Sequence, residues 1–444
     1  MAERPSGLAT DFYELAMAAS YLRRGMTAPA TFSLFLRRLP PDRGFVVVAG
    51  LEDCLDYLAD YRFQPEDLTF LSALGFDQQA LDTFRGLRFT GSVRAIPEGR
   101  VVFADEPLLE VTAPIAEAQL VETYLLNQVT FQSAVATKAA RCRLAAGDAD
   151  LIDFSFRRTH GLEAAMKVAR ASAIAGFTAT SNAAAAHRYG LRASGTMAHS
   201  YVQAFARESD AFAAFAADHP EQTTFLVDTY DTLTGVRHAV ETIRRRQLRG
   251  SLAIRLDSGD LLALSIASRR LLDDAGLPTV RIIASGDLDE HEIDRLVRGA
   301  APIDAYGVGT RMGVSADAPY LDSVYKLVAF DGRPVMKLSP GKATQPGPKQ
   351  AYRAPAPGPI GPDLLTAADE PAPLGMEPLL VPVMEYGLRR DGSADPVAVA
   401  RDRLRADLCR LPRATRRLKA PAPVTVEVSP GLLSLASLVR STAG

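Results

Sequence analysis

The stretch "LAIRLDSGDLLALSIASRRLLDDAG", Leu252 to Gly276, changes from one pattern to another within a few residues. The apolar run at its start predicts a strand, and the leucine and isoleucine residues after Asp260 recur at the spacing of an amphipathic helix. Between the two patterns lie Arg255, Asp257 and Ser258. A plain turn needs neither a guanidinium nor a pair of carboxylates, so the junction itself is a candidate binding site.

The alternation of strand and helix continues on both sides of this junction. Short apolar runs, each followed by a polar cap and in most cases by a helical segment, have the sequences "LIDFSF", "TTFLVDT", "LAIRLD", "VRIIASGD" and "IDAYGVGT". Strands separated by helices in this way pair in parallel. The sequence therefore predicts parallel β/α units over residues 124–340.

The rest of the chain has a different pattern. Residues 1–123 mix helical patterns with short strand-like runs, which predicts an N-terminal α+β domain, completed by part of the C-terminal region. Residues 341–444 are expected to form a C-terminal segment with a proline-rich loop and terminal helices. Within it, "RAPAPGPIGPDLLTAADEPAPLG" predicts irregular surface chain or a linker, and "DPVAVARDRLRADLCRLP" predicts an amphipathic helix with its arginines in solvent.

Composition and charge exclude several classes of protein. Fifty Lys and Arg residues against 52 Asp and Glu leave a formal net charge of -2, so no global basic field favours nucleic acid or an acidic membrane. No run is long enough to cross a membrane, and the N-terminus lacks the pattern of a secretory signal. Cys54, Cys142 and Cys409 have neither zinc-site nor disulfide spacing, which predicts reduced thiols in a cytoplasmic protein.

Polar residues recur where the predicted parallel strands end. The segments are "DFSFRR", "VDTYD", "RLDSGD", "ASGDLDE" and "GVGTR". In a β/α barrel these ends form the rim of the active site. Helix caps and turns would explain any one of them. Together they suit a ligand with phosphates and a polyol, because glycine turns bind phosphate, arginine and lysine neutralise charge, and carboxylates bind ribose hydroxyls and Mg²⁺.

Seven ordered blocks resemble the nicotinate phosphoribosyltransferase family from about residue 8 to residue 353. They are "TDFYELAMA", "DFSFRRTHG", "SGTMAHS", "IRLDSGDL", "SGDLDE", "YGVGTRM" and "VYKLVAFDGRPVMKLSPGKATQPGPKQAYR". The resemblance implies an α/β fold in which an irregular β/α barrel carries an N-terminal α+β domain, the type II phosphoribosyltransferase fold. It also implies an NAD-salvage reaction in which nicotinate and phosphoribosyl pyrophosphate give nicotinate mononucleotide and pyrophosphate, with ATP hydrolysis coupled through a phosphohistidine and with Mg²⁺ as cofactor.

The resemblance implies catalytic roles for four residues. His199 would carry the phosphoryl group, and Asp228 would orient and polarise its imidazole. Asp257 would bind the ribose hydroxyls, and Arg255 would pair with the pyridine carboxylate. His160 stands where many relatives have glutamine, and we interpret it as a polar variant without a catalytic role. The metal ligands are left unassigned.

The resemblance also implies a set of substrate-binding residues: Tyr13, Phe154, Arg157, Arg158, Thr196, Ser258, Ser285, Gly286, Asp287, Gly309, Thr310 and Lys326. The two glycine-containing pairs, 286–287 and 309–310, would cradle the 5'-phosphate, with Lys326 as the counter-charge. Arg157 and Arg158 would face the pyrophosphate or the ring carboxylate.

The aromatic ring of the substrate would lie between Phe154 and Tyr13. The resemblance implies that Tyr13 comes from the other subunit of a homodimer, so that each active site is shared between two chains. Thr196 would donate a hydrogen bond to the pyridine carboxylate.

Three other functions stay open at this point. A nicotinamide phosphoribosyltransferase would place an aspartate near the amide, whereas the corresponding segment Thr180–Asn182 is neutral here, which favours the acid substrate. A quinolinate phosphoribosyltransferase would need additional cations and no phosphohistidine. The third possibility is a non-catalytic relative that binds phosphoribosyl ligands.

Overall fold

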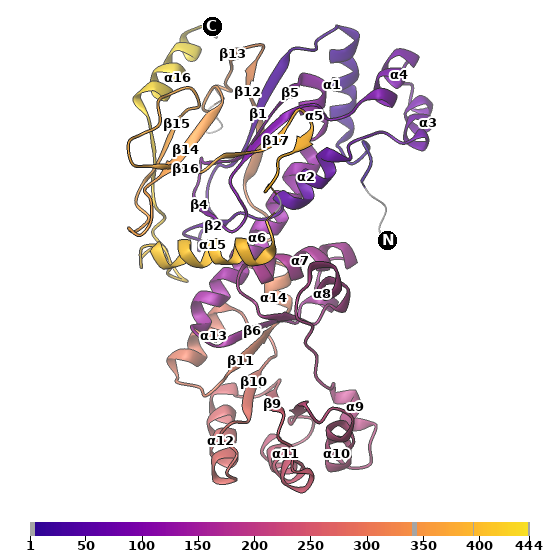
Figure 1. The fold of residues 1–444 in the computed structure, drawn as a ribbon, viewed down its shortest axis with the longest axis vertical. Helices are drawn as coiled ribbons and strands as arrows, with labels where there is room; N and C mark the ends of the chain where they lie inside the picture. The colour runs from indigo at the N-terminus through magenta and orange to yellow at the C-terminus, as the bar shows by residue number, and fades with distance from the viewer. Residues whose placement is uncertain (1–4, 340–343, 394, 443–444) are drawn as a thin grey trace. The chain divides into compact units, whose positions relative to one another are not determined.

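Figure 1 shows a computed structural model of the chain, which describes residues 5–339, 344–393 and 395–442. The chain divides into two compact units. Unit 1 combines Met1–Thr137 with Ala318–Gly444, and unit 2 is the continuous segment Lys138–Asp317. The domain boundaries predicted from the sequence, after residues 123 and 340, stay a prediction.

An antiparallel sheet forms the centre of unit 1. The order of its described strands is β13 (Arg333–Pro334), β12 (Ser323–Phe330), β1 (Pro29–Leu36), β5 (Pro107–Pro114), β3 (Ser92–Ala95), β17 (Val381–Glu385) and β18 (Leu388–Arg389). Strand β1 lies between β5 and β12, where Ala30 is opposite Ala113 on one side and Phe330 on the other. The strands on either side of β1 thus come from opposite ends of the sequence.

Two smaller sheets and a set of helices complete unit 1. The sheets are β2 (Val46–Val47) with β4 (Val101–Val102), and β16 (Glu377–Pro378), β14 (Lys349–Arg353), β15 (Asp363–Ala367) and β19 (Val426–Val428) in that order. The helices are α1 (Phe12–Arg23), α2 (Leu51–Ala59), α3 (Pro65–Ala73), α4 (Gln78–Gly86), α5 (Ile115–Leu120), α15 (Val397–Arg410) and α16 (Pro430–Thr442), with α6 (Glu122–Ala146) continuing into unit 2.

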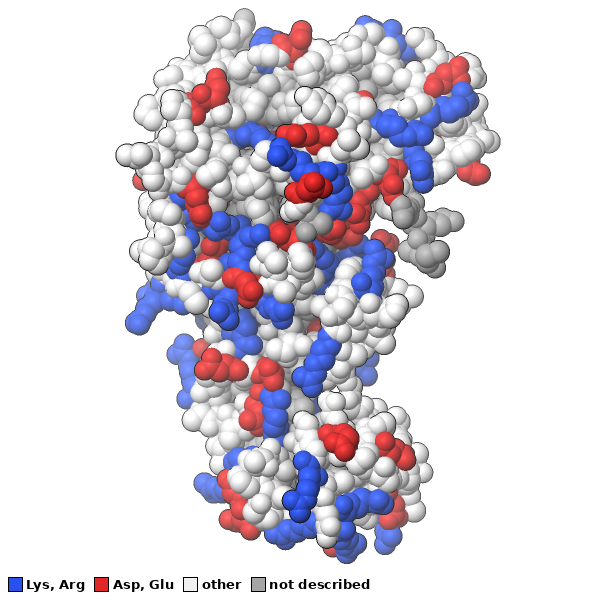
Figure 2. Space-filling view, viewed as in Figure 1, with Lys and Arg blue, Asp and Glu red and all other residues white. Residues whose placement is uncertain are grey.

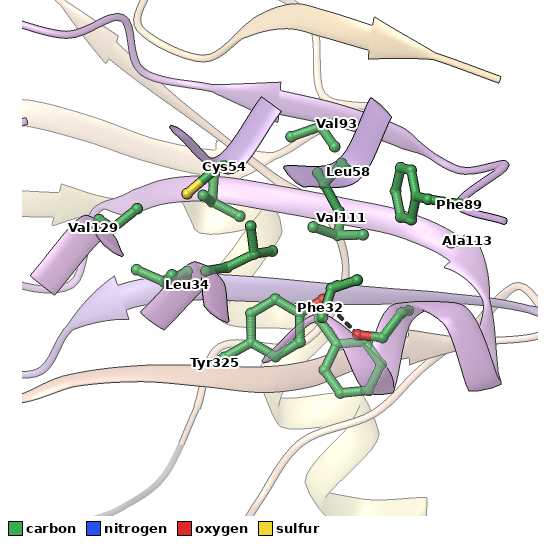
Figure 3. Close-up of a cluster of buried hydrophobic side chains, with 14 of the residues drawn as sticks. Phe32, Leu34, Cys54, Leu58, Phe89, Val93, Val111, Ala113, Val129 and Tyr325 are labelled. Carbon is green, nitrogen blue, oxygen red and sulfur yellow. Dashed lines mark hydrogen bonds between the residues drawn. The ribbon is translucent and has the colours of Figure 1, made fainter. Parts of the chain in front are cut away.

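The core of unit 1 lies between the antiparallel sheet and the helices (Figure 3). The rings of Phe32 on β1 and Tyr325 on β12 stack with their centroids 4.8 Å apart. Leu34 on β1 and Val111 on β5 pack in the same cluster, together with Leu58 from α2. All five side chains are buried, so the removal of apolar surface from water holds the helix layer on the sheet.

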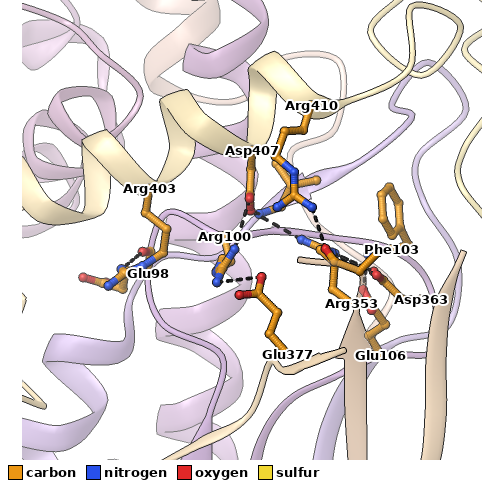
Figure 4. Close-up of polar contacts among 12 residues, drawn as sticks. Glu98, Arg100, Phe103, Glu106, Arg353, Asp363, Glu377, Arg403, Asp407 and Arg410 are labelled. Atoms are coloured by element: carbon orange, nitrogen blue, oxygen red, sulfur yellow. Dashed lines mark hydrogen bonds and ion pairs between the residues drawn. The ribbon is translucent and has the colours of Figure 1, made fainter. Parts of the chain in front are cut away.

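Two predictions for the C-terminal segment are wrong. The stretch predicted to be irregular contains strand β15, which pairs with β14 and places Asp363 in the interior. The arginines of α15 do not all form a solvated face: Arg405 is exposed, but Arg403 donates to Glu98 O and Arg410 donates to Ala354 O and Gly358 O (Figure 4). The flanking prolines concealed a five-residue strand, and helical spacing alone does not reveal what the polar face contacts.

Unit 2 has an open parallel sheet, half of an irregular barrel. The order of its described strands is β7 (Ala179–Thr180), β6 (Asp150–Asp153), β11 (Ala305–Val308), β10 (Arg281–Ala284), β9 (Ser251–Leu256) and β8 (Gln222–Leu226). Its neighbouring strands pair in parallel. The predicted parallel β/α organisation is confirmed, and the two-residue strand β7 is an addition to it.

Helices follow most of the strands of unit 2. They are the 3-10 helix η1 (Phe156–Arg158) and α7 (Leu162–Ile174), α8 (Ala183–Tyr189), α9 (His199–Gln203), α10 (Glu208–Asp218), α11 (Thr232–Arg246), α12 (Leu261–Asp274), α13 (Glu290–Arg298) and α14 (Thr310–Gly313). Asp231, Asp260 and Asp289 accept backbone hydrogen bonds as N-caps of α11, α12 and α13. The last aspartate of each strand-end segment is therefore a cap, and the earlier one is left for other contacts.

None of the helices in the described ranges is both long enough and apolar enough to cross a bilayer. Figure 2 shows acidic and basic side chains interspersed on the face that it draws.

Candidate active site

Strand register in unit 2 brings the predicted polar residues together. Arg255 in β9 lies opposite Leu226 in β8 and Ile283 in β10. The chain positions two residues further along each strand therefore lie side by side at the carboxyl edge of the sheet, and they are occupied by Asp228, Asp257 and Ser285.

A chain of hydrogen bonds joins these side chains. Asp228 Oδ2 accepts from Asp257 N at 2.9 Å and from Ser258 Oγ at 2.7 Å. Asp257 Oδ1 accepts from Ser285 Oγ at 2.5 Å. The other oxygen of Asp228 is buried and has no hydrogen-bond partner among the described residues. Asp228 thus fixes the loop after β9 and keeps one oxygen available to a donor or a cation.

Arg255 is mostly buried, with 13% of its side chain exposed. Its Nη1 donates to Thr196 Oγ1, its Nη2 lies 4.0 Å from Asp257 Oδ1, and its Cζ lies 6.0 Å from the centroid of the Phe154 ring. Burial lowers the pKa of Arg255, and the carboxylates of Asp257 and Asp228 oppose this shift. Its Nε is buried and has no hydrogen-bond partner within the described residues, so the guanidinium keeps one unsatisfied donor.

The position of the Phe154 ring depends on a glycine of the neighbouring strand. A Cβ atom on Gly307 would lie 2.5 Å from the ring, much closer than carbon atoms approach in proteins. The backbone of Phe154 is fixed by its N–H, which donates to Val308 O at 2.8 Å. Any side chain at residue 307 would therefore displace the ring.

His199 is the first residue of α9, and its side chain is 40% exposed. Its Nδ1 lies 3.2 Å from Thr229 Oγ1, and its Nε2 lies 3.7 Å from Asp257 Oδ2. These contacts differ from the predicted pairing with Asp228. Oδ2 of Asp228 is bonded to the loop after β9, and the imidazole contacts Thr229, the residue next to Asp228 in sequence.

The first glycine-containing loop approaches the end of β9 closely. Gly286 has a φ of 92°, and a Cβ atom there would lie 2.0 Å from Asp257 O. Asp287 follows with a φ of 49°, also in the left-handed region. Only glycine fits at residue 286 without moving the backbone that carries Asp257.

The second loop begins with Gly309, the N-cap of the short helix α14, and continues with Thr310. The next residue, Arg311, places its Nη1 3.1 Å from Oδ2 of Asp289, which caps the helix after the first loop. This ion pair joins the two loops to which we assigned phosphate binding.

Arg157 and Arg158 lie in η1 and are both exposed. Their guanidinium groups have no hydrogen-bond or ion-pair partner in the part of the chain that the structure describes. The charge of Arg157 contributes to the lowered pKa of Arg255, so the two cations lie near each other. His160 is exposed two residues further on.

Comparison with known proteins decides the family. The sequence profile of the nicotinate phosphoribosyltransferase N-terminal domain matches residues 8–130, and that of the nicotinate phosphoribosyltransferase family matches residues 149–352. Nicotinate phosphoribosyltransferase pncB2 of Mycobacterium tuberculosis is 48% identical over 414 residues, which are 93% of this chain and 89% of that relative. This chain belongs to the nicotinate phosphoribosyltransferase family.

Two further similarities agree with this membership. The nicotinate phosphoribosyltransferase of Bacillus subtilis is 46% identical over 78% of this chain and 72% of its own length. The crystal structure of human nicotinic acid phosphoribosyltransferase superimposes with a TM-score of 0.87 and 29% identity, covering 97% of this chain and 99% of that one. The predicted fold, an irregular β/α barrel with an N-terminal α+β domain, is confirmed as that of the family.

Two residues implied by the family resemblance lie in unit 1. Tyr13 is a half-exposed residue of α1, and Lys326 lies in β12 with its Nζ 3.8 Å from Glu122 Oε1. Burial raises the pKa of Tyr13, and the charge of Glu122 adds to the shift. Tyr13 and Lys326 therefore both lie near the carboxylate of Glu122 within unit 1.

The neutral segment Thr180–Asn182 has fewer exposed side chains than its sequence indicates. Asn182 is fully buried, where its Oδ1 caps α8 at Ala185 N and its Nδ2 donates to Ala165 O. Thr180 is also buried, and Ser181 between them is exposed. Of the three neutral residues, only Ser181 has a side chain open to solvent.

Sequence reasoning missed two residues of the rim. Thr229 contacts His199, and Asp153, at the end of β6, accepts hydrogen bonds from Ser155 and Thr180. The signal for Asp153 was a carboxylate closing an apolar run, and the signal for Thr229 was a hydroxyl next to Asp228. Among the described residues, no group of three or more His, Cys, Asp or Glu side chains is arranged to hold a metal ion.

Proposed function

We propose that this chain transfers the phosphoribosyl group of phosphoribosyl pyrophosphate to nicotinate, coupled to ATP hydrolysis, and so forms nicotinate mononucleotide and pyrophosphate for NAD salvage. The observation that carries the proposal is the unsatisfied buried donor of Arg255. A buried guanidinium with an unpartnered Nε beside an aromatic ring fits a planar aromatic carboxylate, which would pair with the arginine and stack on Phe154.

The carboxylate of Asp257 lies 4.0 Å from Nη2 of Arg255 and makes no hydrogen bond with it, so Arg255 can still pair with an acid substrate, which favours nicotinate over the amide. Thr196 binds Nη1 of Arg255, and the exposed residue of the 180–182 segment is a serine, so neither replaces the carboxylate of the substrate. Quinolinate would bring a second carboxylate. Arg157 and Arg158 are exposed cations that could pair with it, so quinolinate has to be assayed beside nicotinate.

The transfer step needs no protein nucleophile. The ring nitrogen of nicotinate attacks the anomeric carbon, and the electron pair of the breaking carbon–oxygen bond leaves with pyrophosphate. Asp257, held by Ser285, would bind the ribose hydroxyls, and the loops at 286–287 and 309–310 would bind the 5'-phosphate through backbone N–H groups. Arg157 and Arg158 would stabilise the charge of the leaving pyrophosphate.

Magnesium fits this arrangement as an ion that arrives with the substrate phosphates. Mg²⁺ takes oxygen ligands, keeps several waters and needs only one or two protein carboxylates. Asp228 has one unpartnered oxygen and Asp257 lies beside it, so these two are the residues that would hold it. When bound, Mg²⁺ neutralises charge on the departing pyrophosphate.

ATP coupling is assigned to His199, because it is a partly exposed imidazole 3.7 Å from the carboxylate of Asp257. Its phosphorylation would link ATP hydrolysis to the residue that binds ribose. Pyrophosphate release should be assayed with nicotinate, nicotinamide and quinolinate, each with and without ATP. Preference for either rival acceptor would contradict the proposed substrate, and absence of turnover with all three would leave a ligand-binding protein.

His199→Ala tests the coupling separately. The variant should lose nicotinate-dependent ATP hydrolysis and keep a slower transfer that does not require ATP, because the groups that align the substrates remain. The wild type should carry acid-labile, base-stable phosphate that the variant lacks. A variant that still couples ATP to product would refute the role of His199.

We further propose a homodimer with shared sites, in which Tyr13 reaches the ring pocket of the partner chain. Tyr13→Ala should weaken pyridine binding by on the order of 1 kcal/mol or more, and Asp257→Asn should cripple ribose binding. Mixing the two with subunit exchange should bring recovery to roughly a quarter of wild-type activity, since half the dimers then have one intact site. No recovery after exchange is verified by pull-down would exclude shared sites. We also propose that Lys326 is the counter-charge of the 5'-phosphate. A cytoplasmic location of the protein is part of the proposal as well.

A further inference from the structure

Asp153 is a deeply buried carboxylate at the rim of unit 2, with 1% of its surface exposed. No lysine, arginine or histidine of the described ranges pairs with it. Three hydrogen bonds hold it instead, from Ser155 N at 2.9 Å, Ser155 Oγ at 2.6 Å and Thr180 Oγ1 at 2.7 Å. Burying a carboxylate without a cation is unfavourable, so the three donors identify it as a fixed acceptor.

On one side, Asp153 fixes the turn that carries the aromatic ring. Phe154 lies between Asp153 and Ser155 in sequence, and both hydrogen bonds from Ser155 close this turn. The ring of Phe154 packs over Gly307 and faces the guanidinium of Arg255. Moving Ser155 away from the carboxylate would therefore change the distance between the ring and Arg255.

On the other side, Asp153 fixes the turn after β7. Thr180 Oγ1 donates to Asp153 Oδ2 and accepts from Asn182 N at 3.0 Å, and Ser181 N donates to Asp153 O at 2.8 Å. The exposed Ser181 is therefore held by the side chain and the backbone of one residue. A single carboxylate joins the turn with the ring to the turn with the exposed hydroxyl.

We infer that Asp153 is a positioning residue of the pyridine pocket, which sets the separation of Phe154 and Ser181 around the substrate ring. The inference rests on the proposed function. It differs from a purely structural role because it concerns only the ring substrate. The loops assigned to the phosphates, at 286–287 and 309–310, have no hydrogen bond to the Asp153 side chain.

Asp153→Asn is the first test. The amide keeps one acceptor oxygen and replaces the other with an N–H₂ group, which only donates. The amide can therefore accept from the turn of Ser155 or from Thr180, but each oxygen of the carboxylate serves one of them in the wild type. We expect the KM for nicotinate to rise about tenfold, the effect of losing one hydrogen bond to a charged group, with the KM for phosphoribosyl pyrophosphate within about twofold of wild type.

Asp150→Asn is the matched control. It makes the same change on the same strand, at the opposite end, where Asp150 Oδ2 pairs with Arg281 Nη2 at 2.6 Å. Loss of that ion pair should lower stability and leave both KM values unchanged.

Thr180→Val and Thr180→Ser provide a second route that keeps the carboxylate. Valine removes the donor to Asp153 and should reproduce the rise in the KM for nicotinate, whereas serine should retain the wild-type value. In the double variant Asp153→Asn/Thr180→Val the effects should not multiply, because both changes break the same link. If Asp153→Asn does not fold, the comparison of valine with serine decides.

Equal increases in both KM values, or lower stability with both KM values unchanged, would overturn the inference and leave Asp153 a structural residue. Failure of the proposed function would appear differently. In that case the wild type itself would release no pyrophosphate with nicotinate.

Discussion

Arg353 in unit 1 and Arg255 in unit 2 have similar surroundings. Each lies in the interior beside a phenylalanine, with 5.6 Å between Arg353 Cζ and the Phe103 ring and 6.0 Å between Arg255 Cζ and the Phe154 ring. Each also has aspartates nearby. The two arginines differ in how those aspartates are used.

The carboxylates around Arg353 satisfy it almost completely (Figure 4). Its Nε and Nη2 donate to both oxygens of Asp363, and its Nη1 donates to Asp407. Burial alone would lower the pKa of Arg353, but the bonds and charges of its acidic neighbours, Asp363 first, raise it. Arg353 therefore connects strands β14 and β15 to helix α15.

Arg255 has the opposite balance. Its nearest carboxylate oxygen is 4.0 Å away and is shared with Ser285, and the pKa of Arg255 is lowered by burial. A buried arginine with its acceptors in place holds a fold together. A buried arginine whose nearby carboxylates are directed at other donors is prepared for an anion from outside.

The largest expected effect is on stability, from Arg353→Met. Removing the guanidinium leaves Asp363 and Asp407 buried without compensation, so the free energy of unfolding should fall by about 3–5 kcal/mol. Urea titration measures it. The control Arg389→Met removes partly exposed ion pairs to Glu52 and Asp56 and should cost less than about 1 kcal/mol.

Arg255→Met should give the reverse result. The value of kcat/KM for nicotinate should fall by about 100-fold or more, because two hydrogen bonds to a charged carboxylate are lost. The free energy of unfolding should change by less than about 1 kcal/mol, since no bonded carboxylate loses its partner. Arg255→Lys keeps the charge without the planar fork and should recover little activity. A loss of stability as large as that of Arg353→Met would break the comparison.

The smallest expected effect concerns Glu14 of α1, a buried carboxylate in unit 1. Burial raises its pKa to about 7, against the hydrogen bonds from Thr10 and Thr123. Because the folded state binds this proton more tightly than the unfolded state, stability is highest below the unfolded pKa and is lost as the pH rises through 7.

The free energy of unfolding should fall by on the order of 1 kcal/mol between pH 5 and pH 8, and Glu14→Gln should remove that part of the pH dependence. Urea titrations at several pH values measure it. A glutamine variant with the pH dependence of the wild type would show that Glu14 does not titrate in this range.

The sequence predicted the rim of unit 2 because strand ends are local features. Apolar runs closed by polar residues locate Asp228, Asp257 and Ser285, and parallel pairing places them at one edge. What the pattern could not supply is the direction of each side chain. His199 contacts Thr229 rather than Asp228, and residue spacing does not determine which of two adjacent side chains an imidazole reaches.

Elements that depend on distant partners were also hidden. Strand β15 lies among prolines. It forms because it pairs with β14 and because its Asp363 makes an ion pair with the buried Arg353. In sequence, Asp153 resembles an ordinary strand-end residue. The pattern does not show that the hydroxyls of Ser155 and Thr180 donate to its carboxylate.

The strands of the antiparallel sheet in unit 1 are translated at very different times, because neighbours in the sheet are far apart in the chain. Strand β1 ends at Leu36 and its neighbour β12 runs from Ser323 to Phe330, so a ribosome must add residues 37–330 before the pairing of Ala30 with Phe330 becomes available. At about 5–20 residues per second this takes roughly a quarter of a minute to one minute. Until then one edge of β1 is open to other strands, while every strand of unit 2 has already been translated. Nascent chains of this protein should therefore depend on protection of that edge during translation.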